Sequence, residues 1–174
     1  METGECYENY PWWAVALCNL VSQAIYGLGA FIVYQLGWIW MAIYLVYLLV
    51  LEIRLLGGHC VHCYYYGKAC AFGKGRLSAL FFKRGDPGRF SGKRITWLSM
   101  IPDILVGLVP IIAGIIVLVR GFSWTVLVAM ISVLLLATAG SGAVRNSLAC
   151  RHCRQRELGC PAEQLFRKAG SQES

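Results

Sequence analysis

Residues 11–51 read PWWAVALCNLVSQAIYGLGAFIVYQLGWIWMAIYLVYLLVL and contain no Asp, Glu, Lys, Arg or His over 41 positions. A second stretch, residues 95–144, carries only two charged residues, Asp103 and Arg120. A helix that crosses a bilayer needs about 20 apolar residues, so each stretch is long enough for two helices. The sequence therefore predicts an all-α membrane protein with four transmembrane helices, near residues 12–34, 38–56, 96–118 and 124–146.

The composition agrees with this class. The chain is 57% hydrophobic and 14% charged, with a mean hydropathy of +0.57, whereas soluble domains carry about a quarter charged residues. We expect hairpin turns at Gly37 and at Arg120-Gly121-Phe122. Residues 1–10 are acidic and hold no basic residue, which is not typical of a cleavable signal peptide, so we expect the first helix to be retained.

Basic residues are distributed unevenly between the two ends of these predicted helices. Residues 54–94 hold nine Lys or Arg and residues 145–174 hold six, whereas the second hairpin turn holds one and the first holds none. Basic segments next to transmembrane helices stay in the cytoplasm, so we expect both termini and the middle loop there. The net charge of +7 is then a topology signal. We expect contact with anionic lipid headgroups and no nucleic-acid partner.

The pattern Cys-x-His-Cys-x6-Cys occurs twice, 90 positions apart, and each copy directly follows an apolar stretch. The first copy is Cys60, His62, Cys63 and Cys70, and the second is Cys150, His152, Cys153 and Cys160. We interpret the repeat as an internal duplication. Residues 1–94 then form one helical hairpin with its cysteine cluster and basic loop, and residues 95–174 form a second with its cluster and a polar tail. Residues 12–70 should superpose on residues 102–160.

The charge rule places both clusters on the cytoplasmic face, where thiols stay reduced and cysteine sets are more often metal ligands or catalytic groups than disulfides. Four thiolates are a usual ligand set for structural zinc, and cysteines also hold iron–sulfur clusters. Packing around a two-fold axis predicts one shared site, with Cys70 and Cys160 close by. The four ligands of that site are Cys60, Cys63, Cys150 and Cys153. Two other arrangements stay open: a separate site in each half that adds His62 or His152, and a cluster ligated mainly from one copy.

Two other functions compete with a metal-binding role in structure, sensing or electron transfer. Four helices with cysteine pairs resemble membrane disulfide-forming oxidoreductases that use quinones, which implies a quinone or another membrane protein as partner; the working cysteines of that family, however, face the oxidising side. A metal-ion transporter or chaperone is the third hypothesis, and it needs a polar path through the bundle. The polar residues available for that path are Asn19, Ser22, Gln23 and Asp103. The sequence does not decide whether the protein is an enzyme.

The middle loop carries weaker signals. Tyr64-Tyr65-Tyr66 and the lysines beside glycines are typical of a loop at headgroup depth, and residues 77–82 could form a short amphipathic segment on the bilayer. A phosphate-binding loop is the alternative, although no Walker pattern is present. Asp103 in the third helix is either functional or an interfacial residue that pairs with Arg94.

Overall fold

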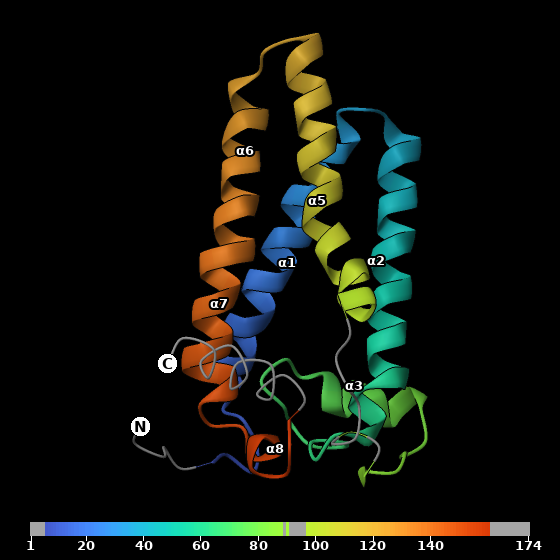
Figure 1. Ribbon diagram of the computed structural model, residues 1–174, viewed down its shortest axis with the longest axis vertical. Helices are drawn as coiled ribbons and strands as arrows, with labels where there is room; N and C mark the ends of the chain where they lie inside the picture. The colour runs from blue at the N-terminus through green and yellow to red at the C-terminus, as the bar shows by residue number, and fades with distance from the viewer. Residues whose placement is uncertain (1–5, 89, 91–96, 161–174) are drawn as a thin grey trace.

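The computed structural model describes residues 6–88, 90 and 97–160, which form a helical bundle with a smaller cap at one end (Figure 1). Among these residues there is no β-strand, and the one β-type pairing is an isolated parallel bridge between Tyr7 and Cys153. Four helices are long and apolar enough to cross a membrane, over Trp12–Tyr34, Trp38–His62, Met100–Arg120 and Trp124–Cys150. The predicted all-α class and the four spans are therefore confirmed. Arg94 and the polar tail after Cys160 lie outside the described residues.

The spans form two hairpins. In the first, α1 (Trp12–Tyr34) leads through Gly37, whose φ is 130°, into α2 (Trp38–Gly58). In the second, α5 (Trp97–Arg120) is followed by one long helical run. That run consists of α6 (Trp124–Leu135), the π-helical η2 (Leu136–Gly140), α7 (Ser141–Ala143) and the π-helical η3 (Val144–Cys150). Both expected hairpin turns are confirmed.

The cap consists of residues 6–11, 59–88 and 151–160. It contains the 3-10 turn η1 (Cys60–His62) and two short helices, α3 (Lys74–Phe81) and α8 (Arg154–Glu157). In Figure 1, α3 and α8 lie at the same end of the bundle, beyond the ends of α2 and α7. Chain segments far apart in the sequence are thus brought together next to the membrane.

The bundle core packs around α1, and a hydrogen bond from Tyr44 joins α2 to α5 within it. Pro110 in α5 has no N–H group and leaves the carbonyl of Val106, four residues earlier, without its helical donor. Tyr44 in α2 donates its hydroxyl to that carbonyl at 2.8 Å. Pro110 and Tyr44 both lie against Gly29 of α1, which has no side chain to keep them apart. The three helices therefore meet closely where Tyr44 replaces the helical donor that the Val106 carbonyl lacks.

The two hairpins do not pack equivalently. A two-fold relation between them would make the contact of α1 with α6 match that of α2 with α5. Instead α1 packs extensively against both α5 and α6, whereas α2 touches α5 only over a short stretch. The predicted duplication of the hairpins is therefore not confirmed by the packing. The packing of the two hairpins differs because α1 packs against both α5 and α6. Its buried residues Ile32 and Val33 lie in the core that these two helices share.

Candidate functional site

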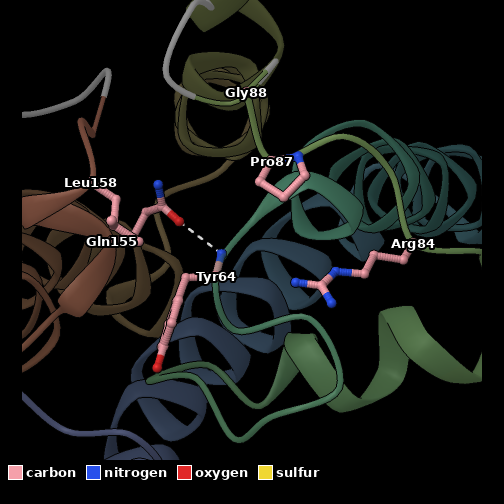
Figure 2. Close-up of a pocket in the computed structure, with 6 residues that line it drawn as sticks. All are labelled: Tyr64, Arg84, Pro87, Gly88, Gln155 and Leu158. Atoms are coloured by element: carbon pink, nitrogen blue, oxygen red, sulfur yellow. Dashed lines mark hydrogen bonds between the residues drawn. The ribbon is translucent and has the colours of Figure 1, made fainter.

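Apart from Cys150 at the end of η3, both copies of the cysteine motif lie in the cap, where direct hydrogen bonds join the chain segments around them. The backbone N–H of Tyr64 donates to Oε1 of Gln155 at 2.7 Å (Figure 2). The hydroxyl of Tyr65 accepts from the backbone N–H of Arg154 at 3.1 Å and donates to the carbonyl of Tyr7 at 2.6 Å. The first copy, the second copy and the N-terminal segment are therefore parts of one packed unit.

The two Cys-x-x-Cys turns have the same backbone hydrogen bonding. The N–H of Cys63 donates to the carbonyl of Cys60 at 3.3 Å, and that of Cys153 donates to the carbonyl of Cys150 at 3.4 Å. The carbonyls of Cys63 and Cys153 each accept from the N–H three residues later, at 3.1 and 3.0 Å. Both second cysteines have extended backbones. The local turns thus agree between the copies even though the hairpins above them do not pack alike.

The second cysteine of each turn lies in the interior of the cap. Cys63 is within electrostatic range of Cys153 and of Cys160 from the second copy, and also of Cys70 and Cys60 from its own. Cys153 is likewise within electrostatic range of Cys160. We call these five cysteines, Cys60, Cys63, Cys70, Cys153 and Cys160, the thiol cluster. It draws on both copies of the motif, as a shared site requires.

Burial keeps the central thiols of this cluster in the neutral form. It raises the pKa of Cys63 above its usual range and raises the pKa of Cys153 to about 12. Backbone N–H groups of the residues just after each cysteine, among them Tyr65 and Gln155, oppose this shift in pKa. Backbone N–H groups directed at a sulfur stabilise the thiolate. Each turn therefore partly offsets the effect of burial, which disfavours the charged form of the cysteine.

The other cysteines have different surroundings. Cys150 is exposed, in contrast to Cys60 at the matching position of the first copy. Cys6 donates to Oε1 of Glu157 at 3.4 Å, which joins the N-terminal segment to α8. Cys18 is buried in α1 within electrostatic range of Cys70. The exposure of Cys150 places it outside the buried part of the cap.

The two motif histidines make contacts that fix their rings within the cap. Nδ1 of His62 lies 2.9 Å from the carbonyl of Asp86, and Gly85 lies so close to the ring that a Cβ there would overlap it. The ring of His152 packs on the ring of Tyr7 with centroids 4.8 Å apart. Each ring therefore serves the packing of the cap.

Across residues 6–88, 90 and 97–160, no group of three or more His, Cys, Asp or Glu side chains is placed to hold a metal ion. All eight motif residues fall within these ranges. The four-cysteine site with Cys60, Cys63, Cys150 and Cys153 therefore stays a prediction, as do the two-site alternatives.

Sequence reasoning missed several residues that build the cap. Tyr65 is buried rather than at headgroup depth, and Tyr10 packs against it and donates its hydroxyl to the carbonyl of Ala149. Gln155 is also buried, because its side chain pairs with Tyr64. Nothing in the local sequence marks Gln155. From the sequence, the tyrosines fit a position at the membrane interface as well as a buried position in the cap, because the amphipathic tyrosine ring suits both environments.

A separate depression of about 270 Å³ lies between the middle loop and the α8 region (Figure 2). Its lining residues are Tyr64, Arg84, Pro87, Gly88, Gln155 and Leu158. Arg84 is its one charged group, and no cysteine or histidine lines it. The depression is therefore distinct from the thiol cluster. No known protein family, curated protein or solved structure matches the chain.

Proposed function

We propose that this chain is a multi-pass membrane protein that binds zinc or an iron–sulfur centre through the thiol cluster of its cap. The observation that carries this proposal is that Cys63 and Cys153, at the same position of the two motif copies, are both partly buried in the cap and close enough for the charge of one to raise the pKa of the other. Cys70 and Cys160 are the third cysteines of the same copies and complete a set of four thiolates. Bound metal then joins the middle loop to the segment that follows the fourth span.

The electrostatics of the two turns support metal binding over thiol chemistry. A nucleophilic cysteine needs a lowered pKa, but burial raises the pKa of both Cys63 and Cys153. A metal ion supplies the positive charge that the buried sulfurs lack, and a coordinating thiol is deprotonated outright. Hydrogen bonds from backbone N–H groups to the sulfurs then stabilise the metal-bound thiolates. The quinone-linked oxidoreductase is the weaker hypothesis on this ground.

The transporter hypothesis is weakened by where the polar residues lie. Asn19 donates to the carbonyls of Val15 and Phe72, and Ser22 donates to that of Cys18. These side chains are already satisfied, whereas Gln23 and Asp103 are exposed on the outside of the bundle. No set of them lines a common path through the described helices. A structural, sensing or electron-transfer role for the metal remains the proposal.

The cap faces the cytoplasm in this proposal. The described basic residues at positions 68–84 and 151–156 lie in the cap, and basic segments are retained in the cytoplasm. A reducing compartment keeps thiols available as ligands.

A double variant tests the shared ligand set. Cys63→Ser with Cys153→Ser should lose most of the metal that co-purifies with the protein under anaerobic conditions, measured by elemental analysis. The exposed Cys150→Ser is the matched control and should keep it, because that thiol lies outside the cluster. A full metal complement in the double variant would contradict the proposal. Thermal unfolding of each variant shows whether the fold survives.

Colour distinguishes the two kinds of centre. An iron–sulfur centre gives visible absorption in the anaerobic protein and a signal that bleaches on reduction, whereas a zinc thiolate site is colourless. Elemental analysis for iron, sulfide and zinc on the same sample decides between them.

A further inference from the structure

The helix α3 (Lys74–Phe81) has its apolar face on the outside. Its buried residues are Gly75 and Ser78, while Leu77, Leu80 and Phe81 are 49%, 79% and 70% exposed. A short helix on the surface of a water-soluble domain has the opposite arrangement. An apolar environment on the outer side of α3 accounts for this reversal.

The inner face of α3 is fixed in place by small residues and hydrogen bonds. A Cβ on Gly75 would overlap the carbonyls of Tyr65 and Lys68, so only glycine fits there. The hydroxyl of Ser78 donates to the carbonyl of Leu56 at 3.2 Å. These contacts leave α3 no freedom to turn its apolar face inward.

The position of α3 places that face at the membrane boundary. The helix runs across the end of α2 (Figure 1), and Lys74 pairs with Glu52 of α2 at 2.7 Å. Glu52 to Gly57 covers about 8 Å of the helix axis and lies within the last three turns of the span that ends at His62. Ile53 and Leu55 on these turns are also exposed. The apolar face of α3 is therefore at the depth where α2 leaves the membrane.

Basic residues flank this face. Arg76 on α3 and Lys83 and Arg84 just after it are exposed. In the part of the chain that the structure describes, none of the three takes part in an ion pair. An apolar face with cations at its border is typical of a helix that lies in the headgroup region of an anionic leaflet.

We infer that α3 is an interfacial helix that inserts Leu77, Leu80 and Phe81 among the acyl chains and binds the phosphate groups of anionic lipids through Arg76, Lys83 and Arg84. The site is independent of the thiol cluster. It anchors the cap to one leaflet, and it selects lipids by headgroup charge.

The test places a photo-cross-linking residue, p-benzoylphenylalanine, at position 80 of the full chain in nanodiscs of phosphatidylcholine and phosphatidylglycerol. Position 81 is a second probe, and position 157 on α8, exposed at the same end, is the matched control. We expect lipid adducts at positions 80 and 81 but not at 157. Adducts with a second copy of the chain, or no lipid adduct at 80 and 81, would overturn the inference.

The composition of the adducts tests the charge preference. Mass spectrometry should find phosphatidylglycerol enriched several-fold over its share of the nanodisc lipids. Replacing Arg76, Lys83 and Arg84 with Gln should return the adducts to the bulk lipid ratio, while Arg120→Gln at the other end of the bundle should not. Equal yields of the two lipids with the unaltered chain would overturn the anionic-lipid site.

Discussion

At the scale of single residues, Cys63 and Cys153 pack partly buried against Tyr10 and Tyr65, whereas Cys150 is exposed. The motif spacing singles out six cysteines equally, but only the fold shows that Cys150 is exposed and that the other five are partly buried. Tyr10 and Tyr65 from distant segments cover this region, and Tyr10 is within electrostatic range of Cys153. Burial of this kind depends on long-range packing, so the sequence predicted the candidate set and could not rank its members.

The raised thiol pKa values predict a loss of stability at high pH. Free thiols have a pKa of about 8.5 to 9, whereas the pKa of folded Cys153 is about 12. Between these values the unfolded chain releases protons that the fold retains, so the free energy of unfolding falls as pH rises. The metal-free protein should therefore lose stability from about pH 9 to about pH 12. The measurement is the free energy of unfolding in detergent as a function of pH, with a chelator and a reductant present.

Cys153→Ala is the control for that pH dependence. It removes one titrating group, so its stability should fall less steeply than that of the unaltered chain over the same pH range. Equal slopes would show that other buried groups with raised pKa values, among them Cys63, Tyr65 and Tyr10, carry the effect.

At the scale of elements, the close approach of α1, α2 and α5 depends on Gly29. A Cβ at this position would lie 2.6 Å from Oη of Tyr44 and 3.0 Å from Cγ of Pro110. Both neighbours are buried, so neither moves aside easily. Gly29→Ala should therefore destabilise the bundle by about 1 to 3 kcal/mol. The free energy of unfolding in detergent micelles is the measurement.

Gly27→Ala is the matched control, because nothing lies within 4 Å of a Cβ at that position of the same helix. Alanine favours a helix over glycine by up to about 1 kcal/mol. Gly27→Ala should thus leave stability unchanged or raise it. Equal destabilisation by both substitutions would contradict a specific close contact at Gly29.

The hydrogen bond from Tyr44 to Val106 gives a second prediction at this scale. Tyr44→Phe leaves the carbonyl of Val106 without a donor where Pro110 already removed the helical one. An unsatisfied buried carbonyl costs about 1 to 3 kcal/mol, and we expect a loss of that size in the free energy of unfolding. Tyr34→Phe, at an exposed position, should change it little. A neutral Tyr44→Phe would mean that another group satisfies this carbonyl.

The elements divide into those that local sequence determines and those that it does not. The four long helices were predicted with every end within six residues of the observed spans, because uninterrupted apolar runs leave no other structure in a bilayer. The packing of the cap was not predicted from the sequence. Its segments have no strong hydrophobic periodicity, and each is held in place by hydrogen bonds to the others. In α3 the expected segment at 77–82 became a helix over Lys74–Phe81, because Lys74 pairs with Glu52 on the neighbouring helix.

At the scale of the whole molecule, the repeat in the sequence and the packing of the bundle diverge. The two Cys-x-x-Cys turns keep the same backbone hydrogen bonds. The helices above them differ, because α1 packs against both helices of the second hairpin, whereas α5 packs extensively against only one helix of the first, α1. A motif can keep its local geometry when its scaffold does not, because turn geometry depends on a few adjacent residues. Helix packing depends on side chains spread along whole helices, which the spacing of cysteines does not report.

The orientation of the molecule in the membrane is the last prediction. Fifteen of the sixteen basic residues lie in residues 54–94 and 145–174, and the described ones at positions 68–84 and 151–156 lie in the cap. Reporter fusions after Gly88 and after Ser174 should therefore report the cytoplasm, and a fusion at Gly121 should report the opposite side. A non-cytoplasmic signal at Gly88 and Ser174 would place the cap in the other compartment. If that compartment is oxidising, the thiol cluster would then form disulfides rather than bind metal.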